Sequence, residues 1–233
     1  MCIPDSSDKR YAARKYATFK KGRPQVKFGN YIARRRWSIL LAGLSFLSPL
    51  VGASALLPKF DRVMVLPDPR EIVDAQLTNH EGEQFRLTQL RGKPSLVFFG
   101  FTNCPDVCPA AMAKFRQLEL SGLVDPTLVN FVFISVDGDR DTPAVVQSYL
   151  QQFSDAFVGL TGDPSSVREI AGAFRASFYR GETRSPSNKY DVAHSTQMFL
   201  LNQAGRLYAE LHNPGIEAMA GITNMLLGAD GLQ

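Results

Sequence analysis

The sequence predicts an α/β domain with a mixed central sheet, preceded by a basic leader and a single membrane segment. Two largely apolar runs rich in β-forming residues, at 94–101 and 128–136, are typical of strands buried on both faces of a sheet. Segments with helical spacing follow them, at 110–120 and 142–153. Strand and helix therefore alternate along the chain, as they do in α/β folds.

The leader is strongly basic. Residues 1–36 carry eleven Lys and Arg residues against two Asp residues, whereas the rest of the chain carries 15 basic and 20 acidic residues. The net charge of +4 therefore arises in the leader, and no basic stripe that could track phosphates follows it. This distribution argues against a nucleic acid partner.

An uncharged stretch from Trp37 to Leu57 has about 21 residues, close to the length that spans a bilayer. We therefore expect residues 37–58 to be a transmembrane anchor or a signal segment, with residues 1–36 in the cytoplasm. Ala53-Ser54-Ala55 resembles a cleavage site and leaves a cleaved leader as the alternative. Both readings place the domain in the periplasm or an equivalent extracytoplasmic space; an uncleaved anchor makes the chain a single-pass protein of the cytoplasmic membrane.

The exported part begins with a proline-rich stretch at 59–71, which predicts a linker, and continues as a domain over 72–233. Two short apolar segments flank the turn-like residues 79–82 and predict an N-terminal hairpin extension. Asp141-Thr142-Pro143 is typical of the entry to a helix, because a capping side chain precedes a helix-starting proline.

The remaining elements complete the sheet and its cover. We expect a short strand, a helix, a hairpin and a closing helix, at 156–160, 164–174, 197–211 and 216–227. This order of elements is that of the thioredoxin arrangement.

Three cysteines, at positions 2, 104 and 108, are too few for the disulfide framework of a small secreted protein. Cys2 lies in the leader and is interpreted as a bystander thiol. Cys104 and Cys108 directly follow a buried strand, where α/β folds often carry active-site groups. Pro109 predicts a helix beginning there with Cys108 at its cap, and the helix dipole is then expected to lower the pKa of Cys108.

The spacing of these two cysteines allows their sulfurs either to form a disulfide or to hold one ion. Two thiolates suit Cu(I), whereas a structural zinc site normally has four ligands. We expect the third ligand to be His194, which precedes an apolar strand, and we assign His80 and His212 to solvated loops. Asp191 or Asp137 is a candidate to orient the imidazole.

Three motifs together resemble the Sco/SenC family: Cys104-Pro105-Asp106-Val107-Cys108-Pro109, the acidic loop 136–143 and Tyr190-Asp191-Val192-Ala193-His194-Ser195. The resemblance covers residues 73–227, with Gly138 in place of the proline usual in the family's acidic loop. It implies a thioredoxin-like copper protein in which Cys104, Cys108 and His194 hold Cu(I) or Cu(II). It further implies a metallochaperone that serves the CuA centre of cytochrome c oxidase subunit II or another exported cuproprotein.

A second function stays open. Cys104 and Cys108 could be the redox-active, catalytic pair of a thiol-disulfide oxidoreductase that reduces cysteines of the oxidase subunit or of another exported partner. Three residues rather than two separate the cysteines, and Ser195-Thr196 stand where thioredoxin has a cis-proline; both differences favour metal binding and a non-enzymatic role. A disulfide that only staples the loop is the third reading, and it would stabilise the fold little.

Overall fold

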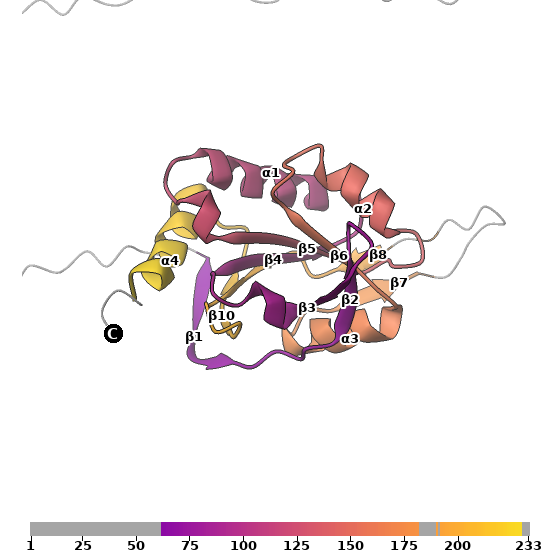
Figure 1. Cartoon of the computed structure of the whole chain (residues 1–233), viewed down its shortest axis with the longest axis horizontal. Helices are drawn as coiled ribbons and strands as arrows, with labels where there is room; N and C mark the ends of the chain where they lie inside the picture. The colour runs from indigo at the N-terminus through magenta and orange to yellow at the C-terminus, as the bar shows by residue number, and fades with distance from the viewer. Residues whose placement is uncertain (1–61, 182–189, 191, 230–233) are drawn as a thin grey trace, which may run out of the picture. The chain divides into compact units, whose positions relative to one another are not determined.

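The computed structural model describes residues 62–181, 190 and 192–229, which Figure 1 draws in colour. The predicted leader at 1–36 and membrane segment at 37–58 lie outside this set. Within the set, no helix combines the length and the apolar character needed to cross a bilayer. The two N-terminal assignments therefore stay predictions.

A mixed sheet forms the centre of the fold (Figure 1). Strands β4 (Ser95–Gly100), β5 (Asn130–Ser135) and β6 (Val158–Thr161) are parallel neighbours, because a helix returns the chain after each of the first two. Strand β9 (Met198–Leu201) runs antiparallel to β4. Over the described residues the sheet has eight strands in the order β1-β10-β9-β4-β5-β6-β2-β3. The predicted α/β class with a mixed central sheet is confirmed.

Strand β4 is buried over its whole length, which explains its unbroken apolar sequence. Leu96 and Phe98 belong to the hydrophobic cluster on one face of the sheet, and Val97 and Phe99 to the cluster on the other. Successive side chains of a strand point to opposite faces, so one strand contributes to both halves of the core.

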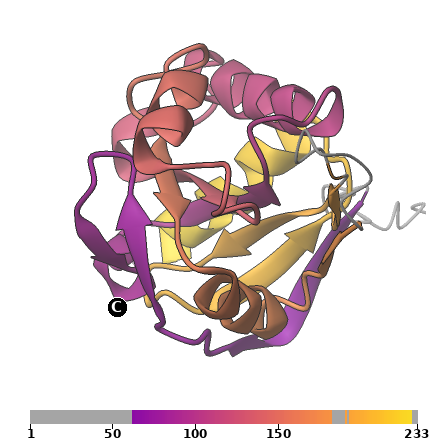
Figure 2. The same cartoon turned by 90° about the vertical axis from the view of Figure 1, so that its right-hand side faces the viewer.

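Helices cover both faces (Figure 2). Helices α1 (Val107–Leu120), α2 (Pro143–Leu150) and α4 (Ile216–Ala229) pack on the face of Leu96 and Phe98. Helix α3 (Pro164–Ala173) packs on the opposite face, and short 3₁₀ helices occupy Leu87–Leu90 and Pro126–Leu128.

Helix α2 begins as the sequence predicts. Thr142 is its N-cap, with its hydroxyl accepting a hydrogen bond from the N–H of Val145, and Pro143 is its first residue. Asp163 caps α3 in the same manner. Each cap directly precedes a proline, which fixes the point at which the loop after a strand turns into a helix.

The predicted N-terminal hairpin is confirmed as strands β2 (Gln76–Asn79) and β3 (Gln84–Arg86). The side-chain oxygen of Asn79 accepts the N–H of Glu83 at 2.8 Å and closes the turn. Because β2 also pairs with β6, the hairpin extends the main sheet.

A second hairpin joins β9 to β10 (Leu207–Leu211), also as predicted. Strand β9 pairs with β4 in a register that sets Phe98 opposite Met198. Because the two strands are antiparallel, the segment that follows β4 and the segment that precedes β9 lie at the same end of this strand pair.

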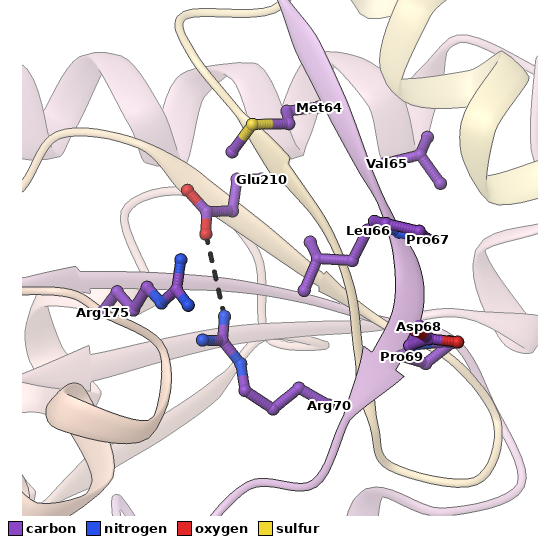
Figure 3. Close-up of a pocket in the computed structure, with 9 residues that line it drawn as sticks. All are labelled: Met64, Val65, Leu66, Pro67, Asp68, Pro69, Arg70, Arg175 and Glu210. Carbon is purple, nitrogen blue, oxygen red and sulfur yellow. Dashed lines mark ion pairs between the residues drawn. The ribbon is translucent and has the colours of Figure 1, made fainter.

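A strand stands where the sequence predicts a linker. Residues Val63–Arg70 form β1, which pairs antiparallel with β10. The pairing breaks between Val65 and Arg70, where two prolines cannot donate to a ladder. A pocket of about 480 Å³ opens at this break, and the side chains of Arg70, Arg175 and Glu210 point into it (Figure 3). The pairing makes this segment part of the folded domain.

Candidate metal centre

The two cysteines of the domain lie at the junction of β4 and α1, Cys104 in the loop and Cys108 in the helix. The helix begins at Val107, so Cys108 falls in its first turn and not at the cap, which is Asp106. Pro109 is accommodated there because backbone N–H groups of a first turn have no partner within the helix. Cys108 is fully buried, whereas Cys104 lies in the preceding loop and is half-buried.

His194 reaches the cysteines on a two-stranded ribbon that the sequence did not predict. Strands β7 (Phe178–Arg180) and β8 (Val192–His194) pair so that Phe178 lies opposite His194. The N–H of Ser195 donates to the carbonyl of Ser177 at 2.8 Å and continues the ribbon. Strands of three residues are too short to show a hydrophobic periodicity, so the sequence pattern does not predict this ribbon.

Two phenylalanines hold the imidazole from the side of the core. The ring of His194 packs edge-on against Phe98 and Phe101, with ring centroids 5.8 and 5.7 Å apart. Edge-to-face contacts of this kind fix the orientation of a ring as well as its position. The imidazole is thereby held beside the cysteine loop.

The three predicted ligands meet. The ligand atoms of Cys104, Cys108 and His194 all lie within 4.8 Å of one another, and Nε2 of His194 is 3.3 Å from Sγ of Cys108. Metal bonds to nitrogen and sulfur measure about 2.0 to 2.3 Å, so two donors on one ion are at most about 4.6 Å apart. Small shifts of the side chains would therefore let one ion contact all three.

The imidazole presents the correct nitrogen. Nδ1 of His194 is 2.7 Å from the carbonyl oxygen of Ser195, which can only accept a hydrogen bond, so Nδ1 carries the proton. Nε2 then directs its lone pair toward Cys108. Burial lowers the pKa of His194, which keeps the ring in the neutral form that binds metal.

The orienting partner of His194 is therefore a backbone carbonyl, and the expectation that Asp137 plays this role is wrong. The buried carboxylate of Asp137 instead accepts hydrogen bonds from the hydroxyl of Tyr190 and from Nε of Arg140. The other candidate, Asp191, lies outside the described residues. A backbone acceptor leaves no trace in side-chain patterns, which explains the error.

Asp137 belongs to a cluster that holds the start of the histidine segment. The ring of Tyr190 lies between two guanidinium groups, 3.9 Å from that of Arg140 and 4.5 Å from that of Arg180. Arg180 also faces Asp137 at 3.5 Å. Because Tyr190 precedes His194 by four residues, the cluster ties the histidine segment to the acidic loop.

A second buried acid, Asp141, holds the cysteine loop. Its carboxylate accepts the N–H of Thr102 at 2.9 Å, the hydroxyl of Thr102 at 2.6 Å and the hydroxyl of Ser135 at 2.6 Å. Thr102 precedes Cys104 by two residues. Sequence analysis missed this role, although Asp141 directly precedes the residue that caps α2.

The expected low pKa of Cys108 is wrong. Burial is the largest influence and raises the pKa of Cys108, and the neighbouring Cys104 raises it further. A hydrogen bond with the backbone of Phe101 lowers the pKa without offsetting burial. In the metal-free protein the group is therefore a thiol that can donate to Nε2 of His194.

The other two histidines lie elsewhere. Nδ1 of His80 accepts the N–H of Gly159 at 3.0 Å and ties the β2–β3 turn to β6. The side chain of His212 is exposed, with Nε2 3.9 Å from a carboxylate oxygen of Glu210. Neither belongs to the cluster of metal-ligating atoms.

The structure explains why residue 138 is a glycine. An ideal β-carbon at this position would overlap the carbonyl oxygen of Gly162. The backbone of the acidic loop thus approaches the end of β6 more closely than a residue with a side chain allows.

Comparisons with known proteins agree with this geometry. The family model described as SCO1/SenC matches residues 68–226. A SCO2-like protein of Rickettsia prowazekii is 33% identical over 131 residues, which cover 56% of this chain and 64% of that protein. The structure of Bradyrhizobium japonicum ScoI with copper bound is 32% identical with a TM-score of 0.60, covering 66% of this chain and 98% of the other. The structure of yeast Sco1 with copper bound is 29% identical with a TM-score of 0.63, covering 69% and 90%. The thioredoxin-like prediction agrees with these matches.

Proposed function

Because the chain belongs to the SCO1/SenC family, we propose that it carries one copper ion, bound by Cys104, Cys108 and His194. The observation that carries the proposal is the approach of these three ligand atoms to within 4.8 Å of one another. Two thiolates and one imidazole form a soft donor set that suits Cu(I). Related proteins whose structures contain copper support the choice of metal.

The site can both hold copper and release it. Cys108 lies on its buried side, whereas Cys104 and His194 are both partly exposed. A three-coordinate site leaves a position free for an incoming sulfur or nitrogen ligand. Exchange is therefore expected to begin on the side of Cys104 and His194, and Cys108 takes up a proton as it releases the ion.

We infer that the acceptor approaches over the first turn of α1. A pocket of about 300 Å³ lies there, and residues from both ligand-bearing segments line it, among them Val107 and Thr196. Val107 is exposed, so an acceptor that enters this pocket can contact its apolar side chain. The acceptor that the family resemblance favours is the CuA centre of cytochrome c oxidase subunit II, and another exported cuproprotein is the alternative.

The sequence pattern supports an extracytoplasmic location for this transfer. In this proposal residues 1–36 stay in the cytoplasm, residues 37–58 anchor or export the chain, and the domain over 72–233 works in the periplasm or an equivalent space. The tether keeps the domain near a membrane-bound acceptor.

Anaerobic loading of the full-length chain with Cu(I) tests the proposal. We expect one copper per chain, and an affinity at least about tenfold lower for His194→Ala, because removing even a supporting group costs about that much. The exposed His212 provides a matched control, since His212→Ala should bind copper as the wild type does. Unchanged affinity in His194→Ala would remove the histidine from the site.

The runner-up, a thiol-disulfide oxidoreductase, is favoured by one observation. Cys104 and Cys108 are adjacent and not bridged, and Cys104 is accessible enough to attack a partner disulfide. Two anaerobic mixing experiments with a CuA domain separate the two functions. Transfer of copper from the loaded protein to the reduced domain supports the carrier. Reduction of the oxidised domain's disulfide by the metal-free protein supports the enzyme.

A further inference from the structure

Tyr149 carries a buried hydroxyl that has no hydrogen-bond partner among the described residues. The side chain lies on α2 and is 9% exposed. Nearly all buried polar groups in folded proteins have a partner, and leaving one unpaired costs free energy. The unpaired hydroxyl of Tyr149 therefore calls for an acceptor that the metal-free arrangement does not supply.

The position of Tyr149 on α2 favours a phenol that leans toward the cysteine loop. Side chains of a helix lean toward its N-terminus, and Tyr149 stands near the C-terminal end of α2. The N-terminus of α2 follows Asp141, the residue that holds Thr102 and with it the cysteine loop. We therefore expect the phenol to extend from α2 toward this loop.

The packing of the Tyr149 ring also relates it to Cys108. The ring of Tyr149 packs on that of Phe133 with centroids 5.4 Å apart. Phe133 in turn adjoins the cysteine, because a β-carbon built on Gly100 would lie 2.9 Å from both Sγ of Cys108 and Cε2 of Phe133. Tyr149 and Cys108 therefore lie in one hydrophobic cluster, and Phe133 lies near both.

Electrostatics agree with this placement. Burial raises the pKa of Tyr149, and electrostatic coupling to Cys108, Cys104 and Asp141 raises it further, in that order. The hydroxyl thus lies within the electrostatic range of both sulfurs and stays protonated, as a donor must.

We propose that Tyr149 is a positioning residue whose hydroxyl donates a hydrogen bond to the sulfur of Cys108 in the copper-bound state. This inference rests on the proposed function. A thiol sulfur is a weak acceptor, whereas a metal-bound thiolate is charged and accepts more strongly. The hydroxyl therefore gains its partner only when the site is loaded, and it stabilises the loaded state over the metal-free one.

Tyr149→Phe tests this, because it removes only the hydroxyl. In the full-length chain we expect one copper per chain as in the wild type, with about tenfold lower affinity, the smaller end of the loss that outer-shell partners cause. With Cu(II), the sulfur-to-copper charge-transfer band should shift to longer wavelength, because an unsupported thiolate gives up its electron more readily. The metal-free melting temperature should not fall, since an unpaired group has been removed.

Tyr208→Phe is the matched control, because Tyr208 is a partly buried tyrosine on β10. It should change neither the affinity nor the band. Wild-type affinity and an unshifted band in Tyr149→Phe would overturn the role of Tyr149 and leave the copper site intact. A lower metal-free melting temperature would also overturn it, by showing that the hydroxyl already has a structural partner. Failure of the wild type to bind copper would instead overturn the proposed function.

Discussion

Nε2 of His194 lies 3.3 Å from Sγ of Cys108, although 86 residues separate the two along the chain. The imidazole is neutral, and its Nδ1–H donates a hydrogen bond to the carbonyl of Ser195. The lone pair of Nε2 therefore faces the thiol of Cys108. A proton thus occupies the path between two metal ligands in the metal-free protein, and copper must displace it.

Copper affinity should therefore depend on pH. Since the pKa of Cys108 is raised, its thiol is protonated near neutrality, and each rise of one pH unit from 7 to 8.5 should increase the Cu(I) affinity at least about tenfold, because Cys108 alone releases one proton. Because the pKa of His194 is lowered, its proton adds to this slope only in acid. Competition with a Cu(I) chelator across this range checks the slope. A pH-independent affinity would contradict the protonated thiol.

The stability of the metal-free domain should fall in acid partly through His194. A folded-state pKa below the unfolded value of about 6.5 means that the unfolded chain binds the proton more readily, so this contribution is present above pH 6.5 and is lost as pH falls through the lowered pKa. Melting temperatures between pH 5 and 7 should drop less for His194→Gln than for the wild type. The exposed His212→Gln should follow the wild type, and equal slopes for all three proteins would refute the effect.

Asp141→Asn should loosen the cysteine loop. The change weakens charge-assisted hydrogen bonds to Thr102 and Ser135 inside the protein and should destabilise it by about 1 to 3 kcal/mol, measured by urea denaturation. Copper affinity should fall with it. The exposed Asp139→Asn is the control, expected to stay within about 0.5 kcal/mol. Equal stability of the two variants would show that Asp141 does not hold the loop.

Gly100→Ala should displace Cys108. The added methyl would lie 2.9 Å from Sγ of Cys108 and from the ring of Phe133, and overpacking of this kind costs about 1 to 3 kcal/mol. Both the melting temperature and the copper affinity should fall. Gly172→Ala on α3 meets no atom within 4 Å and should be neutral or stabilise the helix. Wild-type copper affinity in Gly100→Ala would mean that the sulfur can move without consequence.

Val107→Asp should slow copper transfer and leave copper binding intact. Val107 is exposed at the pocket beside the ligands but contributes no ligand atom. A carboxylate there would oppose an approaching partner, so the transfer rate to a CuA domain should fall about tenfold, the usual scale for an unfavourable contact at an interface. Stopped-flow transfer checks the rate and chelator competition checks the affinity. An unchanged rate would place the approach of the acceptor on another face.

Much of this arrangement could be predicted from the sequence because its signals are local. The uniform burial of Ser95–Gly100 produces an unbroken apolar run, and Thr142 before Pro143 marks a helix start directly. The pairing of Val63–Arg70 with β10 could not be predicted, because its prolines resemble a linker. The high pKa of Cys108 was missed for a physical reason. The sequence indicates the start of a helix, whose dipole lowers the pKa of a nearby thiol, but it does not indicate how deeply the thiol is buried, and burial raises the pKa.

The register of β4 against β9 has a consequence for the order of events in the cell. The cysteines leave the end of one strand and the histidine enters at the start of the other, so no copper site exists until these distant segments have paired. An unfolded chain then offers only a dithiol, and ion capture waits for folding to finish. Folding of the domain and its loading with copper are thereby coupled.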